Sequence, residues 1–111
     1  MATLTVQTLA RAGLTPAYAA AGASGDEFPN SGKEWVEFVN ANVSTPRTVT
    51  IVTPQAVDTL AVADRTLTVP ASGRLKAGPW PTGTYNAPSG RVQMTYSANA
   101  DLTVGVFKLG A

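Results

Sequence analysis

The 111-residue sequence contains neither cysteine nor histidine. Without cysteine, the chain has no disulfide framework, no thiolate nucleophile and no thiolate ligand for a metal ion. Without histidine, it lacks the usual base of a Ser-His-acid triad and the side chain that most often carries protons near neutral pH. We therefore expect a protein that is not an enzyme, has no catalytic residues and binds neither a metal ion nor another cofactor.

Charged side chains are also few, at 14% of the sequence, and the formal net charge is +1. Soluble domains carry roughly 25% charged residues, so this composition suits a protein that packs against a partner. A nucleic-acid-binding surface needs a strong basic excess, and a membrane span needs about 20 consecutive apolar residues. The sequence has neither, and its first residues lack the basic and apolar regions of a signal peptide. We expect no nucleic acid and no membrane among its partners, and folding in a cytoplasm.

The charges are unevenly distributed along the chain. Residues 1–64 contain three basic and six acidic side chains, whereas residues 65–111 contain five basic and one acidic. Opposite poles would guide docking or self-association if the fold kept the two halves apart. A fold that interleaves the halves would mix the charges instead, and the sequence leaves both arrangements open.

The last third of the chain alternates apolar and polar residues between turn signals. Successive side chains of a strand point to opposite faces, so these apolar residues are expected to share one buried face: Leu67, Val69, Val92, Met94, Tyr96, Leu102, Val104 and Val106. Similar alternation predicts strands at residues 3–9, 34–40 and 47–53. Their expected core residues are Val36, Phe38, Val49 and Ile51, whereas Glu37 is expected to face water.

Turn signals separate these segments and give the fold class. Residues 26–32 and 40–46 have turn composition, and residues 55–63 fit a loop with a short edge strand. About seven or eight short strands at this spacing predict an all-β fold, an antiparallel β-sandwich resembling a jelly roll.

The N-terminal segment differs in composition from the rest. We divide the chain into an N-terminal strand with a small-residue arm, residues 1–25, and a β-sandwich domain, residues 26–111. A short helix around Tyr18 is one alternative, because alanine favours helices. Pro16 and the nearby glycines favour an extended arm or a second short strand. Side chains this small bury little surface, so such a segment often becomes ordered only against a partner.

Two tryptophans are the main candidates for partner contacts. Trp35 lies on the strand face opposite the expected core pair, and Trp80 lies in the corner Gly78-Pro-Trp-Pro81, where two prolines stiffen the backbone. Trp80 either plugs the end of the sandwich or anchors a partner, since tryptophan is enriched in binding hot spots. The complete candidate interface is Leu4, Val6, Leu14, Tyr18, Trp35, Arg74, Lys76, Pro79, Trp80, Pro81 and Tyr85.

Several stretches resemble a group of small structural proteins encoded in the head-gene region of tailed bacteriophages and prophages. They are Thr5-Val-Gln-Thr8, Ala12-Gly-Leu-Thr-Pro-Ala-Tyr18, the segment 26–30, Thr48-Val-Thr-Ile-Val52, Thr68-Val-Pro-Ala-Ser-Gly73, the corner 78–81 and Gly90-Arg-Val-Gln-Met-Thr-Tyr-Ser97. The resemblance implies a virion component, a decoration (cement) protein that binds the major capsid protein on the outer capsid surface. It also implies a homotrimer or other homo-oligomer, and an N-terminal arm that reaches the shell or a neighbouring copy.

Two alternatives remain beside the decoration protein. One is another virion role, in head-tail joining or in the tail. The other is a carbohydrate-binding β-sandwich that uses Trp35, Trp80 or Tyr85 as stacking platforms, which requires these rings to be exposed.

Overall fold

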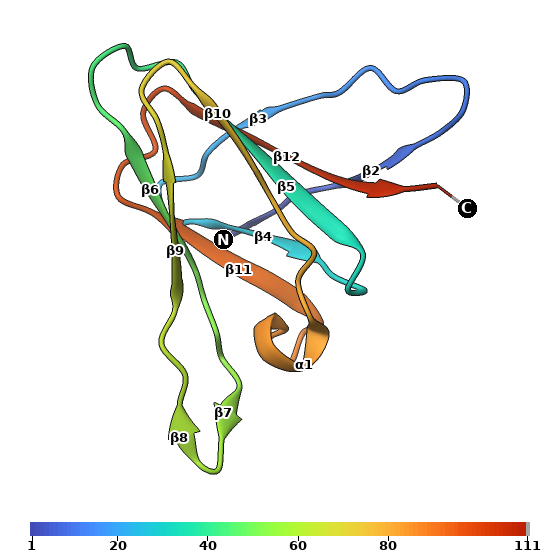
Figure 1. Cartoon of the computed structure of the whole chain (residues 1–111), viewed down its shortest axis with the longest axis vertical. Coiled ribbons are helices and arrows are strands. Elements are labelled where there is room, and N and C mark those ends of the chain that lie inside the picture. The colour runs from blue at the N-terminus through green and yellow to red at the C-terminus, as the bar shows by residue number, and fades with distance from the viewer. Residues whose placement is uncertain (111) are drawn as a thin grey trace.

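The computed structural model describes residues 1–110, which form twelve β-strands and one short helix (Figure 1). The strands are β1 (Ala2–Thr3), β2 (Val6–Leu9), β3 (Ala19–Ala20), β4 (Asp26–Pro29), β5 (Glu34–Asn40), β6 (Arg47–Ile51), β7 (Ala56–Val57), β8 (Leu60–Ala61), β9 (Arg65–Val69), β10 (Arg74–Ala77), β11 (Arg91–Tyr96) and β12 (Leu102–Leu109). Helix α1 (Thr82–Tyr85) follows the corner at residues 78–81. The all-β prediction is confirmed. The strand count was too low because two-residue strands such as β1 and β7 are too short to show alternation.

Two mixed five-stranded sheets form a sandwich-like arrangement. Sheet A has the order β1-β4-β11-β6-β9, and sheet B has the order β10-β5-β12-β2 with β3 also paired to β12. Strands β7 and β8 form a separate hairpin. The prediction of a purely antiparallel sandwich is wrong, because β1 pairs with β4 and β2 pairs with β12 in parallel. Both parallel pairs are made by the N-terminal segment, which adds β1 to sheet A and both β2 and β3 to sheet B.

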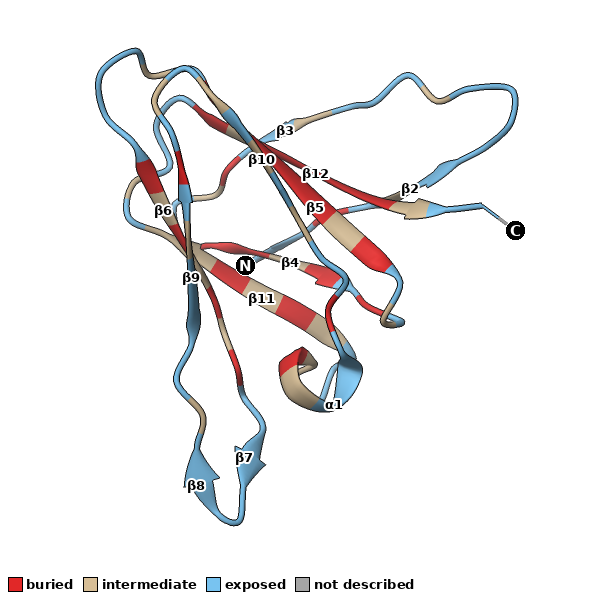
Figure 2. Ribbon diagram, in the orientation of Figure 1, coloured by how far each residue is buried: buried red, intermediate tan, exposed pale blue. Residues whose placement is uncertain are grey.

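The hydrophobic core lies between the sheets and contains most of the predicted inward residues. These side chains are at most 1% exposed: Val36, Phe38, Val49, Ile51, Val69, Val92, Met94, Leu102, Val104 and Val106. Figure 2 shows the resulting alternation of buried and partly exposed residues along β5 and β11. Leu67 and Tyr96 are only partly buried and pack against the edge of this core. Alternation therefore predicted the inner faces of the main strands correctly.

The N-terminal segment contributes to both sheets. The predicted single strand at residues 3–9 is interrupted at Leu4 and Thr5, where the chain passes from sheet A to sheet B. Leu4 is buried in the core at this crossing, and its amide donates to the Glu27 carbonyl at 2.7 Å. No helix forms around Tyr18; the chain is extended there and enters β3, which pairs with Thr103 and Val104.

Residues 26–29 form strand β4 rather than the predicted turn. Phe28 is fully buried in the core, and β4 pairs with β11 in antiparallel register. Asp26 is 1% exposed, and its carboxylate accepts hydrogen bonds from the Tyr96 hydroxyl (2.7 Å) and the Gly22 amide (3.0 Å). The turn composition of this segment was misleading because these hydrogen bonds let an aspartate begin a buried strand.

The two charge-biased halves of the sequence interleave in the fold. Strands β5 and β6 from the acidic half lie between strands from the basic half. Both ion pairs among the described residues join the halves, Arg74 with Glu37 at 3.6 Å and Arg91 with Glu27 at 2.8 Å. Of the two arrangements that the sequence left open, the mixed one is therefore favoured.

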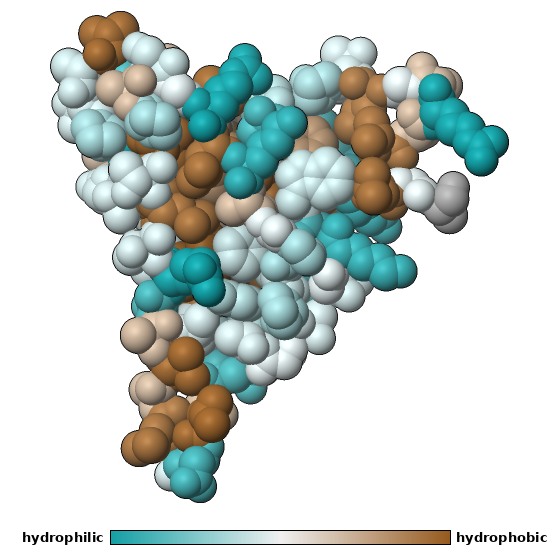
Figure 3. Space-filling view, viewed as in Figure 1, coloured by the Kyte–Doolittle hydropathy of each residue, from teal (hydrophilic) through white to brown (hydrophobic). Residues whose placement is uncertain are grey.

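The molecule is a thin plate with two projections. Its extents are 42 × 37 × 20 Å, and its outline in Figure 3 is roughly triangular. One projection is the loop between β2 and β3, and the other is the β7–β8 hairpin at the lower left of Figure 1. The hairpin turns at Asp58 and Thr59, whose φ angles are 51° and 62°. Among residues 1–110, no helix has the length and apolar character to cross a bilayer.

The core assignment predicts a large contrast between two aliphatic side chains. Ile51 is fully buried, whereas Val43 in the β5–β6 loop is 82% exposed. We expect Ile51→Ala to lower the free energy of unfolding by about 2–5 kcal/mol, because it leaves a cavity between the sheets. Val43→Ala is expected to change it by less than about 0.5 kcal/mol. Urea denaturation measures both, and equal effects would contradict the assigned core.

Candidate functional site

The outer surface of sheet B gathers more of the candidate interface than any other described surface. Strand β5 places Trp35 and Glu37 on this surface because Val36 and Phe38, on its other face, fill the core. Strand β12 adds Phe107, which lies opposite Trp35. Strand β10 adds Lys76, which lies opposite Glu37, and Arg74, which lies opposite Val39. We call the surface formed by Trp35, Glu37, Arg74, Lys76 and Phe107 the Trp35 face.

Phe107 is the centre of an aromatic stack on this face. Its ring centroid lies 6.0 Å from that of Trp35 at an interplanar angle of 28°, and 6.0 Å from that of Tyr18 at 63°. Gly105 makes room for this arrangement, since a Cβ there would lie 2.9 Å from the Phe107 ring and 3.1 Å from the Ala17 carbonyl oxygen. Aromatic pairs in these geometries add about 0.5–1.5 kcal/mol each beyond area burial. The stack therefore holds the N-terminal arm against the sheet.

Glu37 lies beneath the arm and is only 7% exposed. Its carboxylate accepts a hydrogen bond of 2.6 Å from the Tyr18 hydroxyl and lies 3.6 Å from the Arg74 guanidinium. The prediction that Glu37 faces water is wrong, because the arm covers its strand face and supplies a donor. The pKa of Tyr18 lies above its ordinary value because its hydroxyl donates to Glu37, with burial and the Glu37 charge acting in the same direction.

A side-chain clamp closes the base of the arm. The Gln7 amide nitrogen donates to the Ala17 carbonyl at 2.8 Å, and the Ala17 amide donates to the Gln7 side-chain oxygen at 2.8 Å. We call the segment 10–16 between these anchors the arm loop. Its residues are exposed except for Leu14, which is half-buried. The clamp and the stack fix both ends of a loop whose middle is open to contact.

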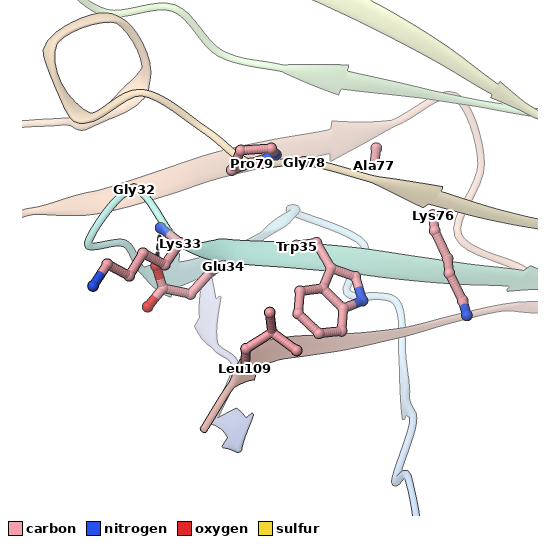
Figure 4. Close-up of a pocket in the computed structure, with 9 residues that line it drawn as sticks. All are labelled: Gly32, Lys33, Glu34, Trp35, Lys76, Ala77, Gly78, Pro79 and Leu109. Atoms are coloured by element: carbon pink, nitrogen blue, oxygen red, sulfur yellow. Dashed lines mark hydrogen bonds between the residues drawn. The ribbon is translucent and has the colours of Figure 1, made fainter. Parts of the chain in front are cut away.

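An open groove adjoins the stack on the other side of Trp35. This Trp35 groove is lined by Gly32, Lys33, Glu34, Trp35, Lys76, Ala77, Gly78, Pro79 and Leu109 (Figure 4). Its volume is about 530 Å³. Pro79 and Leu109 are exposed and Trp35 is half-buried, so the lining includes an accessible apolar part. Lys33 and Lys76 are exposed and flank it.

The third charged residue of the groove, Glu34, is internally hydrogen-bonded. Its Oε1 accepts from the Ser31 amide at 2.8 Å, the Ser31 hydroxyl at 2.9 Å and the Lys33 amide at 3.1 Å. Burial would raise the pKa of Glu34, but these hydrogen bonds outweigh burial and lower the pKa. The carboxylate therefore has its partners within the turn at residues 31–33.

The structure brings together some candidate interface residues and separates others. Leu14, Tyr18, Trp35, Arg74 and Lys76 line one concavity of the Trp35 face. Pro79 lies in the adjoining groove, and Pro81 lines a separate pocket beside helix α1.

Four other candidates lie in or against the core. Leu4, Trp80 and Tyr85 are buried, and Val6 is partly buried. Trp80 is 3% exposed and packs edge to face with Tyr85 at 5.1 Å. It therefore plugs the end of the sandwich and does not present its ring to a partner. Within residues 1–110, its indole Nε1 has no hydrogen-bond partner.

Sequence reasoning missed Phe107, Gln7 and Leu109. Phe107 and Leu109 continue the outer positions of β12 beyond Val106, so extending the alternation to residue 109 would have identified them. The role of Gln7 had no sequence signal, since it depends on where the arm returns to the sheet. Among residues 1–110, no three acidic side chains are close enough together to hold a metal ion.

The arm contacts predict a change in proteolysis. Tyr18→Ala removes both the ring contact with Phe107 and the hydroxyl that donates to Glu37. We expect tryptic cleavage after Arg11, in the arm loop, to accelerate by about 5- to 30-fold, the factor that corresponds to about 1–2 kcal/mol of lost docking. Mass spectrometry of timed digests measures the rate. Tyr18→Phe keeps the ring and should lie between wild type and Tyr18→Ala; equal rates for all three would contradict a docked arm.

The lowered pKa of Glu34 predicts an acid-dependent contribution to stability. A carboxylate with a depressed pKa in the folded state stabilises the fold above its unfolded value of about 4.3, and the contribution is lost as pH falls through the folded value. We expect Glu34→Gln to cost about 1–3 kcal/mol at pH 7, because it removes charge-assisted hydrogen bonds, and progressively less below about pH 4.3.

Urea denaturation at pH 7 and at several acidic values measures this difference. Asp58→Asn is the control for removal of an exposed carboxylate, and we expect it to cause no loss of stability at pH 7, because Asp58 is exposed at the hairpin tip. A Glu34→Gln deficit that stays constant down to low pH would show that the carboxylate charge does not carry the effect.

The Trp35 face thus combines an aromatic stack, a buried carboxylate bound by the arm and an open apolar groove between two lysines. Aromatic side chains are enriched in the cores of protein–protein interfaces. Comparisons of the chain with protein-family models, with curated proteins and with solved structures found no match.

Proposed function

We propose that the protein is a non-enzymatic virion component, a decoration (cement) protein that binds the outer shell of a tailed phage and stabilises it by linking subunits of the major capsid protein. The observation that carries the proposal is the arm loop, which leaves the sheets as an open projection and is tied down at both ends. Such a loop offers contact residues at a small entropic cost, because the clamp and the stack already order its ends. The resemblance to phage head-region proteins supplies the class of partner.

The chemistry of the arm loop supports contact with another protein. Arg11 is exposed near its tip, and Leu14 lies half-buried beside the Trp35 face. The remaining side chains of the loop are small, which lets a partner backbone approach closely. Many copies on one shell would act together, so a modest affinity for each copy is sufficient for stable decoration.

The proposal also includes the finer fold class. Strands β4, β5 and β6 alternate between sheets A and B, and β10, β11 and β12 do the same. This alternation supports a jelly-roll-like connection, onto which the N-terminal segment adds β1, β2 and β3 as further pairing partners.

The burial of two rings weakens the carbohydrate-binding alternative. Such a module needs exposed aromatic platforms, but Trp80 and Tyr85 are buried against each other at an interplanar angle of 76°. Only Trp35 remains accessible, and it already stacks on Phe107. A role in head-tail joining or in the tail fits the same surfaces as decoration does. The number of copies per particle distinguishes these two virion roles.

Cosedimentation with capsid shells tests the proposal. Shells are assembled from the capsid protein encoded beside this chain, and the pelleted stoichiometry is measured. We expect saturable binding at about one copy per capsid subunit, because a closed shell repeats the same contact. Arg11→Glu with Leu14→Asp should weaken binding by at least about tenfold, equivalent to about 1.4 kcal/mol.

Val43→Asp provides the matched control, since it adds a charge at an exposed aliphatic position outside the arm loop. Circular dichroism checks that every variant keeps its β-structure. If the wild-type protein does not bind shells, the decoration role is excluded. If the arm-loop variant binds like the control, the arm loop is not the contact.

A further inference from the structure

The β7–β8 hairpin carries an apolar tip that is not covered by any described part of the chain. Val57 is 67% exposed and Leu60 is 69% exposed, and they pair across the hairpin. Asp58 lies between them in the sequence and is also exposed. In Figure 3 the lower projection is accordingly brown, with hydrophilic atoms at its end. The tip thus presents two aliphatic side chains and one carboxylate.

Hydrogen bonds at its base hold this hairpin in a fixed direction. The Thr53 amide donates to the Asp64 carboxylate at 2.9 Å, and the Thr53 hydroxyl donates to the Val62 carbonyl at 2.9 Å. The Gln55 side chain donates to the Asn86 carbonyl at 2.7 Å, which ties the hairpin to the region of helix α1. A projection anchored in this way loses little freedom when it docks.

The Trp35 groove has the complementary properties. Its lining exposes apolar surface at Trp35, Pro79 and Leu109, and exposed Lys33 and Lys76 flank it. The Glu34 carboxylate accepts hydrogen bonds from the Ser31 and Lys33 amides. Its single negative charge does not neutralise the two positive charges of the lysines. The groove therefore suits a short apolar segment that carries a carboxylate.

We propose that the hairpin tip of one copy docks into the Trp35 groove of a second copy. Val57 and Leu60 would cover the apolar lining, and Asp58 would pair with Lys33 or Lys76. The hairpin and the groove lie at different edges of the molecule. The hairpin projects at the lower left of Figure 1, whereas the groove lies where β5 begins and β12 ends. One copy therefore cannot fill its own groove, and the contact is head to tail.

Head-to-tail contacts produce closed rings when the rotation between copies closes, and chains when it does not. A hairpin tip buries less surface than the roughly 1,200–2,000 Å² of a standard interface. Association through one contact is thus weak and depends on concentration, whereas a closed ring gives each copy two contacts. Ring formation does not rest on the proposed shell binding, because it is measured on the isolated protein.

Two complementary variants test this contact. The hairpin variant Val57→Ser with Leu60→Ser loses its apolar tip, and the groove variant Lys33→Glu with Lys76→Glu loses its basic flanks. We expect sedimentation velocity of the wild type, from about 1 μM to about 1 mM, to show association that rises with concentration. Each variant alone should weaken the association by at least about tenfold.

Mixing the two variants gives the decisive result. The groove variant retains an intact hairpin, and the hairpin variant retains an intact groove, so an equimolar mixture should form a one-to-one complex that grows no further. Asp58→Lys combined with Lys76→Glu in one chain should restore part of the self-association that each single change removes. Val43→Ser, at an exposed aliphatic site on another loop, should behave like the wild type.

Three results would overturn the proposal. They are a wild-type protein that stays monomeric up to about 1 mM, hairpin and groove variants that associate like the wild type, and a mixture of variants that forms no complex. Shells are absent from these experiments. The two sets of experiments therefore distinguish a protein that self-associates but does not bind shells from one that binds shells but does not self-associate.

Discussion

The antiparallel pairing of β5 with β12 is the interaction on which both faces of sheet B depend. It runs from Leu102 opposite Asn40 to Lys108 opposite Glu34 and joins segments more than half the chain apart. On the inner side it sets Val36 and Phe38 beside Val106 and Val104 in the core. The same register sets Trp35 beside Phe107 on the outer side. Since a shift by one residue would exchange the two faces, core packing and the Trp35 face are specified together.

The buried acidic residues explain how a chain with few charges holds its N-terminal segment. Asp26, Glu34 and Glu37 are each less than 9% exposed, and each accepts hydrogen bonds from nearby donors. Asp26 and Glu37 accept theirs from tyrosines of distant segments, Tyr96 and Tyr18. A buried carboxylate without donors is costly, so these contacts make the fold specific as well as stable. Asp26, from a predicted turn, and Glu37, expected to face water, therefore act as tethers between segments.

The sequence predicts those parts of the fold that depend on local periodicity. The inner positions of β5, β6, β11 and β12 follow from alternation, because a half-buried strand imposes a period of two on its own residues. Strand β4 was missed, and so were the division of the predicted strand at residues 3–9 into β1 and β2 and their parallel pairing, since distant segments decide these pairings. Glu37 was misplaced for the same reason, because the arm that covers it approaches from another part of the chain. Phe107 was overlooked for a different reason, since it lies just beyond the alternation read as far as Val106.

The same distinction applies to the candidate site. The sequence identifies Trp35 as a surface residue from strand parity, but it cannot say which way the ring of Trp80 points from a proline-rich corner. That direction depends on where the corner lies relative to Tyr85 and the end of the core. Residue type therefore predicted both tryptophans as candidate contact residues. Only the fold shows that Trp80 closes the core and that Trp35 lies on the surface.

The turn of the β7–β8 hairpin has a cost in local stability. Asp58 and Thr59 both have left-handed φ angles, 51° and 62°. A turn of this kind favours Asn-Gly, and a β-branched residue in the left-handed region is strained. An Asn-Gly tip would therefore relieve strain and remove the carboxylate between the two exposed aliphatic side chains. The chain thus gives up folding free energy at this position and keeps a carboxylate and a hydroxyl at the end of the projection.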